Sequence, residues 1–364
     1  MDLLKKIRNL DWFLLVPVLL LIFLGFGVIY SAGGGPGTKG FSYASKQLLW
    51  AGVSMFSFVI ILYFGFPKFM EWSYWLYFLA LILLAIVLIL GASAKGAQSW
   101  LGIGPFRLQP SEFGKISLAL VLSRHLCRYP PDNLSRFLSG LAVASPAALL
   151  VLVQPDLGST LVYCFMVLVA LIVAGSPCKY ICTLLGCVAG MMPFAWTLLK
   201  EYQKLRLMVF LNPSVDPLGA GYNVIQSRIA VGSGGFWGRG FLAGLQSKLH
   251  FLPEPHTDFI FSVFAEEFGF VGAIILLSLF ALLFWRMVYI AIRAKDLRAK
   301  IFIAMVSAWI WFQTVESIGM SMGILPITGL PLPFMSYGGS SLLSILISVG
   351  LISSISLSSV KKYE

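Results

Sequence analysis

Two stretches of the sequence carry charged groups at spacings that could do chemistry. In the first, "FLPEPHTDFIFSVFAEE", His256 and Asp258 stand directly before a long apolar run. A carboxylate at the edge of an apolar region is only partly solvated, a setting in which it can act as a general base. The same position would also let Asp258 interact favourably with the positive end of a following helix. The sequence leaves both roles open.

The second stretch, "FRLQPSEFGK", places Glu112 and Lys115 three residues apart. That spacing brings the two side chains together on one face of a helix as an ion pair. Gln109 and Ser111 would lie at the same depth. A purely structural pair is the ordinary explanation, whereas an ionisable pair inside a bilayer indicates a functional site.

Cations of a long polar segment could assist these groups. Arg206 and Lys248 lie there, and such residues could bind an anionic group such as a pyrophosphate. Each could equally be a solvated loop charge or contact a lipid headgroup. Three acids inside apolar runs are expected to bond neighbouring helices: Glu266, Glu267 and Glu316.

The composition shows in which environment the elements that carry these groups must lie. Of 364 residues, 59% are hydrophobic and 11% are charged, and the mean hydropathy is +0.89. Runs long enough to cross about 30 Å of hydrocarbon as helices recur along the chain. The pattern predicts an all-α polytopic membrane protein with ten transmembrane helices. They are expected at 12–31, 47–65, 72–91, 110–126, 136–154, 157–175, 179–199, 258–285, 301–325 and 339–359.

Short loops rich in Lys and Arg predict that both termini are cytoplasmic. Three polar segments then face outward: 92–111, 326–338 and a large extracytoplasmic loop between helices 7 and 8, at about 200–257. Its turn signals and apolar residues predict short amphipathic pieces. The net charge of +11 is explained by this topology and by attraction to membrane lipids. Without a basic stripe carrying interleaved aromatic residues, no nucleic-acid partner is predicted.

Two further motifs flank these segments. "QPDLGST", at 154–160, predicts a turn with Asp156 capping the next helix. "GILPITGLPLPFMSYGGSS", at 323–341, is dense in proline and glycine. Irregular backbone near a membrane is tolerated where it lines a cavity or is buried in protein. This segment is therefore predicted to form a cavity wall.

Together, six motifs resemble the SEDS family (shape, elongation, division and sporulation), and the likeness runs in order over nearly the whole chain. They are "GAQSWL", "FRLQPSEFGK", "QPDLGST", "DPLGAGYNVIQSRIAVGSGG", "FLPEPHTDFIFSVFAEE" and "GILPITGLPLPFMSYGGSS". Within the family, "QPDLG", "GAGYNVIQS" and "AEE" look more like the elongation members than the division members. The resemblance implies one integral membrane domain over 1–364.

The same resemblance implies an activity. Members are peptidoglycan glycosyltransferases that polymerise lipid II into undecaprenyl-linked glycan on the outer face of the bacterial cytoplasmic membrane. Asp258 would be the essential carboxylate, with Glu112 and Lys115 near it. The implied protein partner is a class B penicillin-binding protein. Two positions depart from the family pattern: Ser99 stands where arginine is expected, and Ser317 where asparagine is expected.

Several alternatives stay open. The charge on a pyrophosphate leaving group could be stabilised by Lys115 and Arg206 or by a divalent cation, Mg²⁺ or Mn²⁺. A flippase for the same lipid would use the intramembrane acids as a translocation path. It should need polar groups over the full depth of the bundle, however, and here they concentrate on the outer side. A non-catalytic scaffold would explain the helices but not the outward charges.

Overall fold

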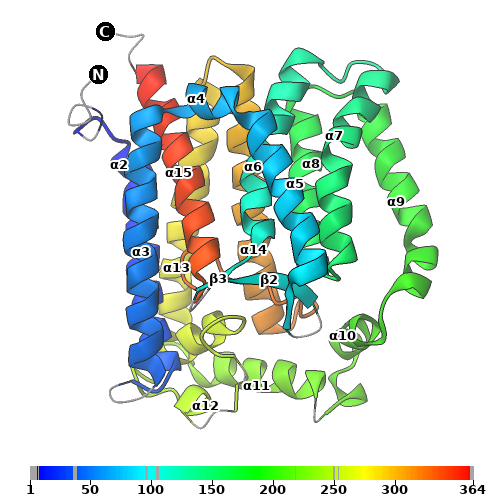
Figure 1. The fold of residues 1–364 in the computed structure, drawn as a ribbon. Helices are drawn as coiled ribbons and strands as arrows, with labels where there is room; N and C mark the ends of the chain where they lie inside the picture. Colours follow the sequence, from blue (N-terminus) through cyan, green and yellow to red (C-terminus); the bar gives the residue numbers. More distant parts are fainter. Residues whose placement is uncertain are drawn as a thin grey trace.

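The computed structural model is a bundle of long helices, and each of the ten apolar segments predicted from the sequence forms one (Figure 1). Their bounds are α2 Trp12–Ala32, α3 Lys39–Phe64, α5 Ser73–Leu90, α6 Pro110–Arg128, α7 Leu134–Val153, α8 Leu157–Val173, α9 Cys178–Leu198, α13 Ile260–Arg293, α14 Leu297–Met322 and α15 Gly339–Val360. The structure describes residues 6, 8–35, 39–94, 97–103, 106–217, 219–248, 251–252 and 254–360.

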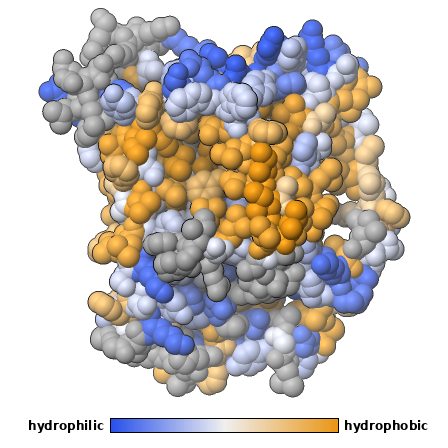
Figure 2. Space-filling view, in the orientation of Figure 1, coloured by the Kyte–Doolittle hydropathy of each residue, from blue (hydrophilic) through white to orange (hydrophobic). Residues whose placement is uncertain are grey.

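The outside of the bundle suits a hydrocarbon environment. Seven of the described helices are long and apolar enough to cross a membrane: α2, α3, α5, α7, α13, α14 and α15. Large apolar side chains point outward, as at Phe23 (73% exposed) and Trp75 (75% exposed). Figure 2 shows a broad apolar band between more hydrophilic ends. Exposed apolar surface of this extent is what a bilayer covers.

Helix α6 is not among these seven helices, and it lies inside the bundle. It carries the polar residues of "PSEFGK", and most of its side chains are buried against α5, α7, α14 and α15. Its neighbour α8 is apolar but has only 17 residues. With α14 and α15, which are also mostly buried, α6 forms the inner part of the bundle from which the candidate site is built.

The polar segments lie at the end of the bundle opposite to the start of α2 and the end of α15 (Figure 1). The predicted loop at 200–257 contains short helices: α10 Glu201–Leu211, a 3-10 turn Pro213–Val215, α11 Ala220–Ser233 and α12 Leu245–Lys248. The segment is therefore divided into short pieces, as predicted, and these pieces are helical. A six-residue helix, α4 Phe66–Glu71, lies at the other end of the bundle.

The strictly all-α prediction is wrong in the segment 92–111. Three short strands form an antiparallel sheet there, in the order β1 Ala92–Ala94, β2 Ala97–Ile103 and β3 Phe106–Leu108. Extended segments near a bilayer must find partners for their backbone N–H and C=O groups, and pairing with one another supplies them. The sheet leads directly into α6.

A break in α13 joins that helix to the outer loop. Gly269 has φ 63° and ψ −160°, which is not helical. The loop before α12 pairs with the break: Arg239 N–H donates to Glu266 O at 3.0 Å, and Phe270 N–H donates to Gly235 O at 2.9 Å. These bonds replace those that the helix loses at the break. The loop that precedes Asp258 is therefore fixed to the same helix that follows it.

Substitution of Gly269 with alanine should destabilise the protein by roughly 2 kcal/mol or more. An alanine would be strained at this φ, and its Cβ would collide with the backbone between Phe236 and Gly238. The measurement is the melting temperature of purified protein in detergent. Gly186→Ala is the matched control, because Gly186 lies in α9 with open space around it. Equal melting temperatures for both variants would contradict this assignment.

Candidate functional site

The Glu112–Lys115 ion pair predicted from the sequence forms at the centre of the bundle. Lys115 Nζ lies 2.7 Å from Glu112 Oε1, and the two residues are 0% and 1% exposed. Lys115 Nζ also lies 4.5 Å from the centre of the Trp309 ring, a cation–π contact. Ser344 Oγ donates to Glu112 Oε2 at 3.1 Å. Helices α6, α14 and α15 thus hold the pair between them.

Asp156 connects this pair to the start of α8. Its carboxylate accepts hydrogen bonds from Ser159 N–H at 2.9 Å and Ser159 Oγ at 2.7 Å, so the predicted helix cap is confirmed. Gln109 Nε2 donates to Asp156 Oδ2 at 3.4 Å. Burial raises the pKa of Asp156, while its bonds to Ser159 and the charge of Lys115 act in the opposite direction. The sequence predicted a cap alone, and the bond from Gln109 is an additional finding.

Asp258 lies half-buried in the turn before α13, against the loop that joins α14 to α15. A Cβ on Gly329 of that loop would lie 3.7 Å from Asp258 Oδ2. The loop is bonded to the residues just before Asp258: Ser336 Oγ donates to Thr257 O at 2.7 Å, and Tyr337 N–H donates to His256 O at 2.9 Å. The proline- and glycine-rich segment therefore packs beside Asp258.

Arg206 and His256 contact the same segment. Arg206 Nη1 donates to Ile327 O at 3.5 Å, and its guanidinium lies over the ring of Tyr202. The His256 ring stacks on Tyr43 with 4.2 Å between ring centroids. Its Nε2 lies 3.8 Å from Glu254 Oε2.

Ser111 and Lys248 are the remaining two predicted site residues. Ser111 O accepts a hydrogen bond from the Tyr163 hydroxyl at 2.8 Å, whereas Ser111 Oγ is buried and has no hydrogen-bond partner among the described residues. Lys248 ends α12, and its side chain lies outside the described part of the structure.

One continuous segment connects both groups of residues. The loop after α14 contacts Asp258, Arg206 and His256, and it continues into α15, where Ser340 Oγ accepts from Gln109 N–H at 3.2 Å. Ser344, one turn further, bonds Glu112. The predicted groups are therefore not scattered, since a single stretch from 323 to 344 contacts most of them.

The three acids expected to bond neighbouring helices behave differently from one another. Glu267 accepts from Ser31 Oγ of α2, as expected, and from Leu242 N–H. Glu266 Oε1 accepts from Leu245 N–H at 2.8 Å and so holds the outer loop rather than a long helix. Glu316 lies near Thr328 of the loop after α14 and bonds no neighbouring helix among the described residues, so there the expectation is wrong.

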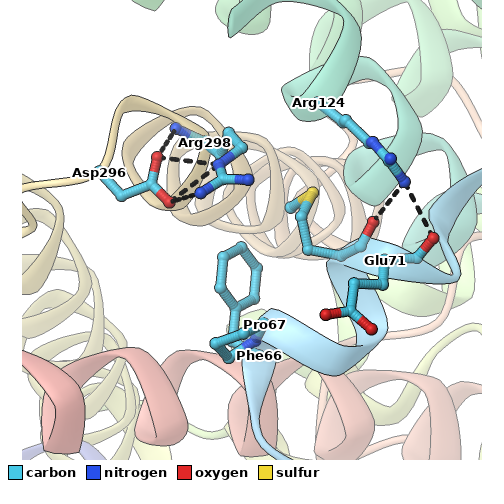
Figure 3. A pocket seen from close by; sticks show the side chains of 7 residues that line it. Phe66, Pro67, Glu71, Arg124, Asp296 and Arg298 are labelled. Atoms are coloured by element: carbon cyan, nitrogen blue, oxygen red, sulfur yellow. Dashed lines mark hydrogen bonds and ion pairs between the residues drawn. The ribbon is translucent and has the colours of Figure 1, made fainter.

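A surface pocket at the other end of the bundle takes no part in this arrangement (Figure 3). Its charged groups are already engaged. Arg298 Nη2 lies 2.8 Å from Asp296 Oδ2, and Arg124 Nη1 donates to the carbonyls of Met70 and Glu71 at 3.0 and 2.9 Å. It contains none of the predicted site residues.

The fold and the site together define a multi-pass membrane protein with a polar site built from inner helices and an irregular loop. A family model described as "Cell cycle protein", covering FtsW, RodA and SpoVE, matches residues 11–361. The chain belongs to this family.

Curated relatives and solved structures agree with that assignment. The peptidoglycan glycosyltransferase MrdB of Escherichia coli (strain K12) is 43% identical over 286 residues, covering 78% of this chain and 77% of the relative. Stage V sporulation protein E of Bacillus subtilis (strain 168) is 36% identical, covering 95% and 96%. A chain of a peptidoglycan synthase complex superposes with a TM-score of 0.84 at 35% identity, covering 96% of this chain and 98% of that chain. The rod shape determining protein RodA of Thermus thermophilus gives 0.73 at 30% identity, covering 96% and 97%.

Proposed function

We propose that this protein is a peptidoglycan glycosyltransferase that polymerises lipid II into glycan strands. Relatives that bear this name cover more than three quarters of the chain. The observation that carries the proposal is the half-buried carboxylate of Asp258, placed against the irregular loop at one end of an apolar bundle. A lipid-linked sugar requires this combination of a membrane-embedded scaffold and a polar site near its edge.

Asp258 is the general base of the proposed reaction. It accepts the proton from the 4-hydroxyl of the acceptor sugar, and the resulting oxygen nucleophile attacks the anomeric carbon of the donor sugar with inversion. The bond from that carbon to the pyrophosphate oxygen breaks, and undecaprenyl pyrophosphate leaves with the electron pair. Positive charge near the leaving group lowers the barrier, and Arg206 and Lys115 are the candidate cations.

The proposed topology follows the distribution of charge. Ten helices cross the bacterial cytoplasmic membrane, both termini are cytoplasmic, and the loop at about 200–257 lies outside. The α2 start and α15 end share the end of the bundle opposite to the Asp258 loop, which supports this arrangement (Figure 1). We treat 1–364 as a single membrane domain.

The proposed biological role is cell elongation and shape, with a class B penicillin-binding protein as partner. The motifs that resemble elongation members support the role. A structural relative belongs to a synthase complex that coordinates polymerization with crosslinking, which supports a transpeptidase partner. Since curated relatives include both RodA and FtsW proteins, loss of rod shape on depletion is the observation that would distinguish elongation from division.

The proposal is tested with purified protein in detergent and labelled lipid II, with products separated by size. We expect glycan polymer from the protein alone or with its transpeptidase partner. Liposomes containing the same labelled lipid test the flippase alternative in parallel. Translocation across the liposome bilayer without any polymer in either assay would overturn the enzyme proposal in favour of a transporter.

A further inference from the structure

Helix α3 contacts the end of the loop after α14, next to the turn that carries Asp258. Three side chains on one face of α3, spaced four and three residues apart, reach this region: Tyr43, Gln47 and Trp50. The Trp50 ring lies against Gly339, where a Cβ would collide with it, and α3 and α15 run side by side (Figure 1). The proposed mechanism gives these three side chains no role.

Gln47 holds the backbone of the loop on both sides of Tyr337. Its Oε1 accepts from Gly338 N–H at 3.2 Å, and its Nε2 donates to Ser336 O at 3.3 Å. The residue is 2% exposed, so both bonds are shielded from water. A side-chain amide offers an acceptor and a donor together, which this pair of backbone groups requires. Gln47 therefore fixes the backbone of residues 336–338.

Two of these loop residues bond the turn that carries Asp258. Tyr337 N–H donates to His256 O at 2.9 Å, and Ser336 Oγ donates to Thr257 O at 2.7 Å. The bonded carbonyls belong to the two residues directly before Asp258. A displacement of the loop would therefore displace the carboxylate as well.

Tyr43 adds a second contact from α3, one helical turn before Gln47. Its ring stacks on the His256 ring with 4.2 Å between centroids and 13° between planes, and its centroid lies 5.3 Å from that of Tyr337. The centroids of the His256 and Tyr337 rings are 5.6 Å apart. Aromatic rings at such separations attract one another. The three rings thus hold together the two residues that share the backbone bond between loop and turn.

We propose that Gln47 is a positioning residue for Asp258 and that the Tyr43 ring assists it. The hydrogen bonds of Gln47 in the described structure go to the loop, so it acts on Asp258 through residues 336–338. This inference rests on the proposed function, because a general base must lie within hydrogen-bond reach of the acceptor hydroxyl. A misplacement of about 1 Å can lower a rate by about 10²-fold.

Hydrogen–deuterium exchange tests the contact without any enzyme assay. Gln47→Met keeps the length of the side chain and removes both amide groups. We expect peptides covering 336–338 and 256–258 to exchange about tenfold faster in this variant, because a buried backbone bond is lost. Tyr77→Phe is the control, since it also removes a bond between helices, from the Tyr77 hydroxyl to Val143 O at 2.6 Å, but at the other end of the bundle.

Polymerisation kinetics with labelled lipid II test the positioning role. Gln47→Met should lower kcat by about 10- to 100-fold and change KM by less than about threefold, because the substrate still binds while the base is displaced. A merely structural role would lower the melting temperature and the folded fraction but leave kcat per folded molecule unchanged. Tyr77→Phe should keep the wild-type kcat.

Tyr43 provides a second comparison, which decides the question if Gln47→Met does not fold. Phenylalanine keeps the aromatic ring, whereas leucine removes the stacking on His256. We therefore expect Tyr43→Phe to retain more of the wild-type kcat than Tyr43→Leu. Equal kcat values for these two folded variants would overturn the role of the Tyr43 ring.

Two results with folded Gln47→Met would overturn the proposal for Gln47. Unchanged exchange at 336–338 would show that Gln47 does not hold the loop, and a wild-type kcat would show that it does not position Asp258. Polymer from the wild type reports separately on the proposed function. If the wild type makes no polymer, the function fails, and the exchange rates still decide whether Gln47 fixes the turn. If it makes polymer and Gln47→Met matches its kcat, the function stands and the positioning role fails.

Discussion

Replacing Asp258 with asparagine should lower the rate of glycan polymerisation by about 10²- to 10⁴-fold, the usual contribution of a general base. Asparagine has nearly the same shape but cannot accept the proton of the acceptor hydroxyl. The turn around residue 258 should persist, because the loop after α14 bonds the backbone carbonyls of His256 and Thr257 and not the Asp258 side chain alone. The measurement is polymer yield over time from labelled lipid II.

The matched control for this experiment is Asp216→Asn. Asp216 is another acid of the long polar segment, and its Oδ1 accepts from Gly219 N–H at 3.0 Å, a bond that asparagine can retain. It should polymerise lipid II at the wild-type rate. A folded Asp258→Asn protein that still makes polymer near the wild-type rate would refute Asp258 as the base. Size-exclusion chromatography of both variants separates loss of chemistry from loss of fold.

The helices were predictable because the bilayer imposes a length and a composition on every crossing segment. The i, i+3 pair of Glu112 and Lys115 was predictable as well, since it depends only on local helix geometry. The sheet was not, because β1 and β3 have three residues each, too few to show an alternating pattern. The helix break at Gly269 was also not predicted, because this glycine lies within a long and mostly apolar stretch.

The surroundings of Glu316 and of Asp258 depend on packing that no local pattern encodes. Glu316 and Asp258 are separated by 58 positions of sequence. The loop after α14 lies beside both, since Thr328 is near Glu316 and a Cβ on Gly329 would lie 3.7 Å from Asp258 Oδ2. The sequence did mark that loop as irregular and near a cavity. The sequence could not show which buried acid lies beside that loop. Glu266 and Glu267 looked similar to Glu316 in sequence, yet each of them receives backbone or hydroxyl donors.

The second large effect is expected at the buried ion pair of Glu112 and Lys115. Substituting Lys115 with methionine distinguishes a structural role of this pair from a role in the reaction. The change leaves Glu112 without its ion-pair partner in a site that is 1% exposed, and it should cost about 3–5 kcal/mol of folding stability. The double variant Glu112→Gln/Lys115→Met removes the unpaired charge too and should recover most of that loss. Thermal unfolding in detergent measures both.

Polymerisation by the same two variants shows whether the Lys115 charge serves the reaction. If it stabilises the leaving group, both variants should lose about 10²- to 10³-fold in rate, even though the double variant is stable. Stability and activity would then separate, because restoring the fold does not restore a positive charge. If the double variant regained the wild-type rate together with its stability, the pair would be structural, and Arg206 would be the cation left to act on the pyrophosphate.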